Sequence, residues 1–137
     1  MNYLRLKMKI LLDTHTLLWF LENSKKLPRK AARTIEARRH PIYVSDITFF
    51  EISIKANIGK LKLQLDVRSF VDLAKRNFQC LPINHEHIIT YQEISCRVSH
   101  RDPFDRMLIA IAKHEEMSLM SGDDKFYDYQ DLINIIW

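Results

Sequence analysis

Residues 100–112 read HRDPFDRMLIAIA and predict a helix that begins with two acids and continues as an apolar segment. Asp102 is suited to cap this helix, and Pro103 suits its first position because the φ angle of proline is already close to the helical value. Three apolar residues then recur at helical spacing, namely Leu108, Ile109 and Ala112. This spacing places Asp105 above a buried face. A first-turn acid also complements the helix dipole, so the stretch alone favours a structural role for both acids.

The composition predicts one domain, residues 1–137, with a sizeable core. Apolar residues make up 47% of the chain and only two residues are glycine, which favours a compact, helix-rich protein. Cys80 and Cys96 lack metal-ligand spacing, so we expect two small buried residues in a reducing cytoplasm. No apolar run approaches the length of a membrane span, so we expect a soluble, cytoplasmic protein. Translation could start at Met1 or at Met8, which directly precedes the first predicted strand.

Positive charge is concentrated in one part of the chain. The formal net charge is +4, and residues 25–40 hold seven Lys and Arg residues against the single acid Glu36. A basic patch beside an acidic pocket would attract a polyanionic substrate. A solvated helix face explains the same charges equally well.

Apolar runs alternate with helical patterns along the whole chain. We expect strands at 8–12, 41–44, 78–83, 117–120 and 132–136, and helices at 14–21, 28–39, 45–58, 67–77, 85–96 and from 103 onward. This alternation predicts an α/β fold in which a parallel sheet is covered by helices on both faces.

Four acids fall where such a fold would bring them to one edge. Asp13 and Asp123 directly follow predicted strands, and ligands bind at the carboxyl ends of parallel strands. Glu51 shares a helix face with Ile47, Ile54 and Ile58, and Asp105 starts another helix. Converging carboxylates repel one another without a cation, and oxygen ligands favour Mg²⁺ or Mn²⁺. We therefore expect metal-assisted hydrolysis of a phosphodiester bond.

Each acid also has a structural interpretation. Asp123 could be a turn residue or the cap of a helix that begins at Asp124, and Glu51 could lie at the exposed edge of its stripe. Other functional classes fit less well. A phosphatase would need an acid where His15 stands, a phosphorelay receiver would need a Lys after the last strand, and a binding-only domain would give the four acids no role.

Four segments in order resemble the PIN-domain endoribonucleases, and among these the toxins of VapBC toxin–antitoxin pairs. They are residues 11–15 (LLDTH), 51–55 (EISIK) with 59–61 (GKL), 100–106 (HRDPFDR), and 121–123 (SGD) with Phe126. The resemblance implies a three-layer α/β/α sandwich with a small central parallel sheet.

It also implies a Mg²⁺- or Mn²⁺-dependent ribonuclease. Asp13 and Asp105 would bind the metal, and Glu51 and Asp123 would complete its coordination or orient water. Asp102 matches an additional acid of this subgroup, and Asp124 is an alternative for the fourth position. The implied partners are an RNA substrate, a VapB-like antitoxin and a second copy of the chain. An RNA-processing nuclease without an antitoxin and an inert PIN-fold binding module are the alternatives.

Overall fold

The computed structural model describes residues 8–95, 97 and 100–137, which contain a five-stranded parallel sheet in the order β3-β2-β1-β4-β5. The strands are β1 (Ile10–Leu12), β2 (Ile42–Ser45), β3 (Gln79–Leu81), β4 (Ser118–Met120) and β5 (Ile135–Ile136). The central strand β1 is wholly buried, because its residues alternate between two apolar cores. Ile10 and Leu12 contribute to one core, and Leu11 contributes to the other.

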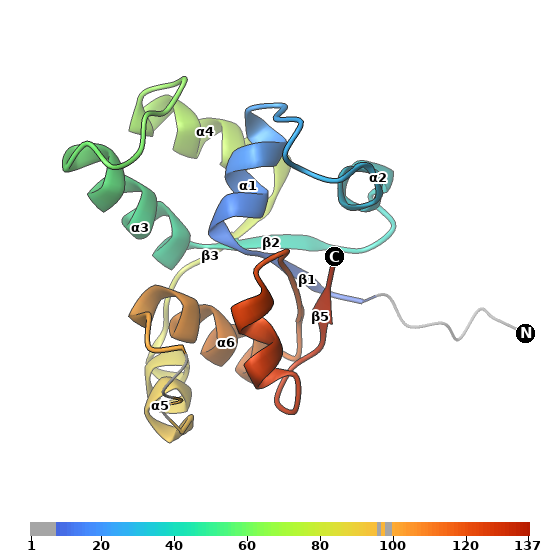
Figure 1. Cartoon of the computed structure of the whole chain (residues 1–137), viewed down its shortest axis with the longest axis vertical. Coiled ribbons are helices and arrows are strands. Elements are labelled where there is room, and N and C mark those ends of the chain that lie inside the picture. The colour runs from blue at the N-terminus through green and yellow to red at the C-terminus, as the bar shows by residue number, and fades with distance from the viewer. Residues whose placement is uncertain (1–7, 96, 98–99) are drawn as a thin grey trace, which may run out of the picture.

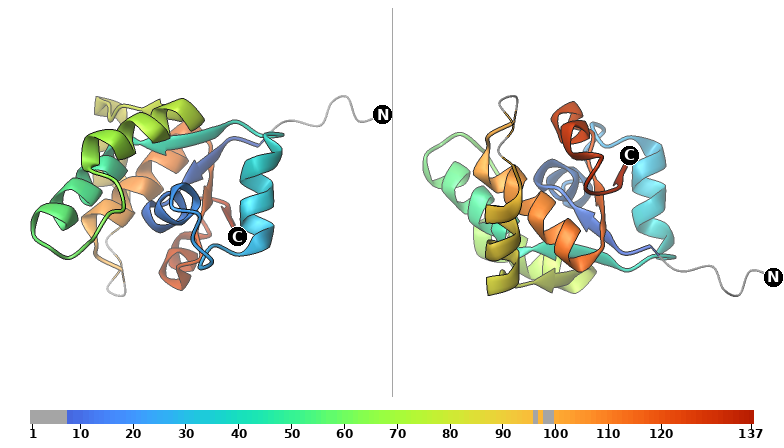
Figure 2. Two further views of the ribbon diagram at one scale, coloured as in Figure 1. Left: turned by 90° about the horizontal axis from the view of Figure 1, so that it is seen from above. Right: turned by 90° about the horizontal axis from the view of Figure 1, so that it is seen from below.

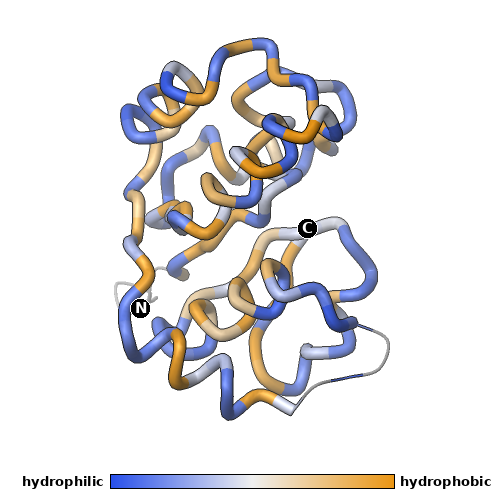
Figure 3. Tube along the Cα trace, turned by 90° about the vertical axis from the view of Figure 1, so that its left-hand side faces the viewer, coloured by the Kyte–Doolittle hydropathy of each residue, from blue (hydrophilic) through white to orange (hydrophobic). Residues whose placement is uncertain are grey.

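Helices cover both faces of this sheet (Figure 1). They are α1 (Thr14–Leu21), α2 (Arg29–Ala37), α3 (Asp46–Asn57), α4 (Val67–Asn77), α5 (His85–Glu93), α6 (Pro103–Glu115) and the 3₁₀ helix η1 (Asp124–Tyr129). Residues of α1, α2 and α4 form the core on one face, and residues of α6 and η1 form the core on the other. Hydrophobic and hydrophilic residues alternate along the helices, as expected for helices with one buried side (Figure 3). The predicted three-layer α/β/α arrangement is therefore confirmed.

Several helix starts follow from their capping residues. Asp13, Ser45, Asp66, Asn84 and Asp102 each accept a hydrogen bond from a backbone N–H in the first turn of the helix that follows. No helix in the described residues is both long and apolar enough to cross a membrane.

Several predicted elements are shorter than the sequence pattern indicates. Helix α2 ends at Ala37 because Arg38 adopts the left-handed conformation, which leaves Ala37 exposed. Helix α5 ends at Glu93, since Ile94 is already extended. The last strand contains only Ile135 and Ile136, because residues 132 and 133 donate their backbone N–H groups to the Tyr129 carbonyl in a turn.

Two expectations about buried side chains also need correction. Ile58 follows the last residue of α3 and is 57% exposed, so it does not extend the buried stripe of that helix. Cys80 is half-buried, and Cys96 lies outside the described residues.

Candidate active site at the carboxyl edge of the sheet

Asp13 is almost completely enclosed by the fold. It directly follows β1, its side chain caps α1, and the residue is only 5% exposed. One carboxylate oxygen accepts a hydrogen bond from the Thr16 backbone N–H at 2.8 Å, and the other accepts one from the Ser121 hydroxyl. Burial raises the pKa of Asp13, and the bonds from Ser121 and Thr16 oppose this effect only in part. The fold therefore holds a carboxyl group whose charge it solvates incompletely.

Glu51 lies on α3 and is also 5% exposed, as its position in the stripe predicts. Its Oε1 atom accepts a hydrogen bond from the Thr14 hydroxyl at 2.7 Å, and its Oε2 atom lies 2.8 Å from the Lys55 ammonium one turn later. The bond to Glu51 raises the pKa of Lys55, and Asp102 and Asp105 add to the rise. Glu51 is thus the one acid of the predicted four for which the described residues provide a lysine or arginine partner.

Asp105 lies in the first turn of α6, with its side chain 24% exposed. Burial raises its pKa, the hydrogen bond from His100 opposes the rise, and the negative charges of Asp102 and Glu51 contribute to it. The effect of Glu51 on this pKa places the two acids, from different helices, within electrostatic range of each other. Asp102 caps α6 by accepting from the N–H groups of Phe104 and Asp105, so its predicted capping role is confirmed.

His100 holds the Asp105 carboxylate in place. Its Nε2 atom lies 3.0 Å from Oδ2 of Asp105, and its Nδ1 atom lies 2.9 Å from the Lys125 carbonyl oxygen. Because a carbonyl only accepts hydrogen bonds, we assign a proton to Nδ1, and the hydrogen bond between Nε2 and the Asp105 carboxyl group then requires a second proton, on Nε2 or on Asp105. The ring is buried against Phe126 and Tyr129, and the Tyr129 hydroxyl donates to the His100 carbonyl oxygen at 2.9 Å.

Asp123 is half-buried and caps η1 by accepting from the Lys125 N–H at 3.0 Å, as the capping interpretation predicted. Its own N–H donates to the Ser121 hydroxyl, which in turn donates to Asp13. Ser121 therefore connects Asp13 with Asp123. Asp124 is exposed in the first turn of η1.

The four predicted acids thus form two linked groups. Ser121 joins Asp13 to Asp123, and Thr14, the neighbour of Asp13, donates a hydrogen bond to Glu51. Glu51 in turn lies within electrostatic range of Asp105. Within the described ranges, no three Asp, Glu, His or Cys side chains are arranged as a ready metal-binding group. The described geometry therefore supports two linked pairs of acids, which is less than the expectation that all four meet at one point.

The donor chemistry of the site nevertheless suits a hard cation. Asp13 and Asp105 have pKa values raised by burial, so their ionised forms lack full compensation from the protein. The hydrogen-bond donors at Asp13 are neutral groups, namely the Ser121 hydroxyl and the Thr16 backbone N–H. Carboxylate oxygens are the ligands that Mg²⁺ and Mn²⁺ prefer.

The sequence reasoning missed four side chains that hold these acids: Thr14, Lys55, His100 and Ser121. Lys55 could have been found as the i+4 partner of Glu51 on a helix. His100 and Ser121 lie in quoted segments, but their roles depend on contacts with Lys125 and Asp13 that no local pattern indicates.

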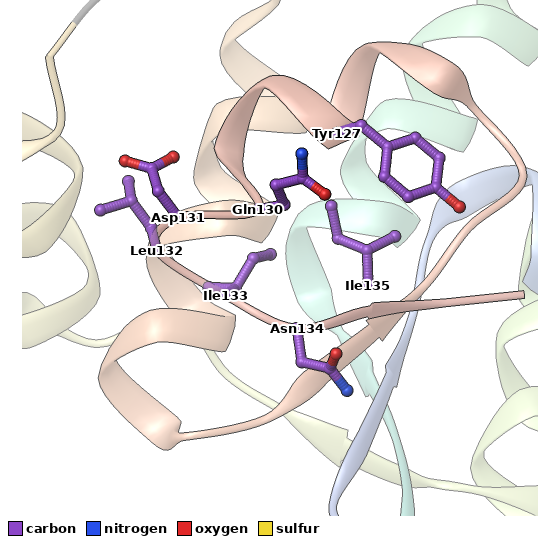
Figure 4. Close-up of a pocket in the computed structure, with 7 residues that line it drawn as sticks. All are labelled: Tyr127, Gln130, Asp131, Leu132, Ile133, Asn134 and Ile135. Carbon is purple, nitrogen blue, oxygen red and sulfur yellow. The ribbon is translucent and has the colours of Figure 1, made fainter.

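Two other surface features lie apart from these acids. A hollow of about 360 Å³ between η1 and β5 contains one carboxylate, that of Asp131, which is bound by Arg97 (Figure 4). The basic residues Arg38 and Arg39 lie in the short segment that leads into β2, and they are therefore at the amino edge of the sheet. This corrects the expectation that the whole basic patch lies beside the acidic pocket.

Solved structures share this fold at low sequence identity. The VapBC2 structure from Rickettsia felis, bound to a DNA fragment from its promoter, matches with a TM-score of 0.70 and 17% identity, covering 95% of this chain and 99% of that chain. DNA-bound VapBC from Salmonella typhimurium matches with a TM-score of 0.70 and 16% identity over 94% and 97% of the two chains. FitAcB from Neisseria gonorrhoeae matches with a TM-score of 0.67 and 16% identity over 93% and 96%.

Among curated proteins, none matches this sequence. The PIN domain family, in contrast, matches residues 10–132, which include all four predicted site acids and every strand except β5. With this match and the parallel sheet between two helical layers, the chain belongs to the PIN domain family.

Proposed function

We propose that this chain is a metal-dependent endoribonuclease that hydrolyses RNA phosphodiester bonds as the toxin of a type II toxin–antitoxin pair. The observation that carries the proposal is the buried Asp13 carboxylate at the carboxyl edge of the sheet, with Glu51 and Asp105 on adjoining helices. Buried acids with raised pKa values at such an edge are typical of functional sites.

In this proposal Asp13 and Asp105 would hold Mg²⁺ or Mn²⁺, and Glu51 and Asp123 would complete the coordination or orient water. When bound, the ion supplies an activated water and neutralises charge that develops on the phosphodiester. The residues around the acids act by positioning. Ser121 and the Thr16 N–H fix the Asp13 carboxylate, and His100 fixes that of Asp105.

The proposed partners rest on the fold relatives. Structures named VapBC and FitAcB, and a toxin–antitoxin complex from Klebsiella pneumoniae, share this fold. We therefore propose a VapB-like antitoxin as the inhibitor, a homodimer as the free toxin and the cytoplasm as the place of action. Light scattering of the purified chain tests the dimer, and co-expression with the product of an adjacent small reading frame tests the antitoxin.

Cleavage of total RNA tests the central proposal. We expect cutting with Mg²⁺ or Mn²⁺, none with EDTA, and none with Asp13→Asn or Asp105→Asn. Asp72→Asn is the matched control, because Asp72 is exposed on α4 and lies outside the acidic site. Undiminished cutting by both site variants would contradict the assignment.

A catalytically inert PIN-fold binding module is the second candidate. It is favoured by the contacts of Glu51, whose two oxygens are already bound by Thr14 and Lys55. Titration with Mn²⁺ separates the candidates. The nuclease binds the ion and loses binding on Asp13→Asn, whereas the inert module shows no binding that depends on Asp13.

A further inference from the structure

A second cluster of charge, opposite in sign to the acidic site, lies at the amino edge of the sheet. A groove of about 390 Å³ runs between the segment that leads into β2 and the segment that leads into β3. Arg39 lines it from the first segment, and Lys75 and Arg76 line it from the end of α4. Figure 2 shows α2 next to the point at which the chain enters β1, which marks this edge.

The groove continues onto the exposed face of α2. An adjoining hollow of about 450 Å³ is lined by Lys30, Arg33 and again Arg39. Because Arg39 lines both depressions, the five basic side chains form one continuous surface. We call these residues, Lys30, Arg33, Arg39, Lys75 and Arg76, the amino-edge cluster.

The described residues offer the amino-edge cluster no direct ion pair, although Asp72 lines a separate hollow together with Lys75. Neither depression is lined by an Asp or Glu residue. In the part of the chain that the structure describes, none of the five side chains forms an ion pair with a carboxylate. All five residues are exposed. Unpaired like charges that share one surface repel each other, so an anionic ligand would relieve this repulsion.

Arg38, in contrast, has a structural role at the same edge. Its guanidinium donates to the Asn77 carbonyl oxygen at 2.6 Å and lies 4.9 Å from the centre of the Phe78 ring. These contacts fix the end of α2 against the end of α4, so the groove is held in shape independently of the cluster.

The chemistry of the surface favours a nucleic-acid strand over an acidic peptide. The apolar residues Ile42 and Phe78 line the groove but are buried, which leaves little apolar surface to anchor a protein side chain. Several spaced Lys and Arg residues match the repeated charges of a phosphate backbone.

We propose that the amino-edge cluster binds the phosphate backbone of an RNA strand, at a site separate from the acids. This proposal rests on the proposed function, since it supplies a second contact for the same substrate. Strand β2, whose four residues span roughly 13 Å, separates the two edges. The cluster therefore contributes affinity to RNA binding and takes no part in the cleavage chemistry.

The test measures binding of a labelled single-stranded RNA of 20 nucleotides by fluorescence anisotropy. All proteins are full-length and carry Asp13→Asn, and EDTA is present, so that no RNA is cut. The groove variant combines R39Q, K75Q and R76Q. Its matched control combines K60Q, K62Q and K113Q, which removes the same charge from exposed residues that line neither depression. Because Lys75 and Arg76 lie in the last turn of α4, a second variant, K30Q with R33Q on α2, keeps the test independent of that helix end.

Salt dependence gives the decisive readout. Three lost phosphate contacts should reduce the slope of log K against log salt by about 2. Across a fourfold rise in salt, the parent should therefore lose roughly 20-fold more affinity than the groove variant. The second variant should reduce the slope by about 1.4. The control should keep the slope of the parent.

The outcomes separate this proposal from the proposed function. Parent-like slopes in both variants overturn the RNA groove and leave the nuclease assignment intact. A reduced salt slope in both variants supports the groove. If the wild-type protein also fails to cut RNA, the groove stands and the nuclease assignment does not. Failure of the parent to bind RNA counts against both. Binding of polyglutamate, measured in the same way, serves as the comparison for an acidic protein segment. If the groove variant loses polyglutamate binding while its RNA binding is unchanged, the choice of RNA as the ligand is overturned.

Discussion

Replacement of Ser121 by alanine removes a fully buried hydroxyl that makes two hydrogen bonds at the candidate active site. The hydroxyl donates to the Asp13 carboxylate and accepts from the Asp123 N–H at 3.0 Å. A hydrogen bond to a charged group contributes about 1.5–3 kcal/mol, and a neutral one contributes about 1 kcal/mol. We therefore expect Ser121→Ala to lower the free energy of unfolding by roughly 2–4 kcal/mol at neutral pH.

The size of this loss should depend on the charge of Asp13. The Ser121 bond stabilises the ionised carboxylate and so lowers the pKa of Asp13, against the larger effect of burial. Its contribution is therefore present where Asp13 is ionised in the folded protein, and it is lost as the pH falls through the folded-state pKa. The destabilisation by Ser121→Ala should be larger at pH 7.5 than at pH 4.

Urea denaturation of a double-mutant cycle with Asp13→Asn measures the coupling. We expect the two changes to couple by about 1 kcal/mol or more, because the strong part of the bond needs the carboxylate charge. Ser118→Ala is the matched control, since Ser118 is buried on β4, the strand that Ser121 follows, but accepts from Asn134. Additivity of Ser121→Ala and Asp13→Asn within about 0.5 kcal/mol would refute this reasoning.

Three further predictions concern stability. Burial raises the pKa of Asp13, so this residue contributes stability at a pH below its unfolded-state pKa, and the contribution is lost as the pH rises through its folded-state pKa. Asp13→Asn should therefore raise the melting temperature at pH 7.5. Asp66 is a helix cap whose pKa is lowered by hydrogen bonds from Ser69, so Asp66→Asn should lower the melting temperature at the same pH. Thr48→Val should stabilise the protein by about 1 kcal/mol in urea, since the buried Thr48 hydroxyl has no hydrogen-bond partner among the described residues, and an unchanged midpoint would contradict this. Leu11→Ala should cost about 2–5 kcal/mol in the same assay, because Leu11 is wholly buried in the central strand, and a loss under 1 kcal/mol would show that the core relaxes around it.

Local sequence patterns predicted the parts of this protein that depend on neighbouring residues. The caps Asp66, Asn84 and Asp102 were found because each bonds a backbone group within three residues. The apolar run of β1 indicated a buried strand, and this in turn placed Asp13 at the carboxyl edge of the sheet. Both inferences needed only the periodicity of the chain and the usual topology of parallel sheets.

Contacts between distant segments could not be predicted in this way. Ser121 reaches Asp13 across 108 residues, and Thr14 reaches Glu51 across 37. Each contact depends on the order of strands in the sheet and on the orientation of a helix, which one sequence does not specify. The position of the basic residues at the amino edge, away from the acids, could not be predicted for the same reason. It depends on helix α2 returning the chain to the start of β2.

Glu51 is the residue on which the two candidate functions differ most. Asp13 and Asp105 have raised pKa values, so a cation would relieve a cost that folding imposes on both. Glu51 is already bound by the Lys55 ammonium, and its other oxygen accepts from Thr14. For Glu51 to serve as a metal ligand, one of these two bonds has to open. The Lys55 side chain is partly exposed and lies at the end of a flexible stem, so it is the partner that can leave at the lower cost. Lys55→Met would leave the buried Glu51 without this cation, and it should therefore increase the affinity of a nuclease for Mn²⁺ but leave an inert module without measurable binding.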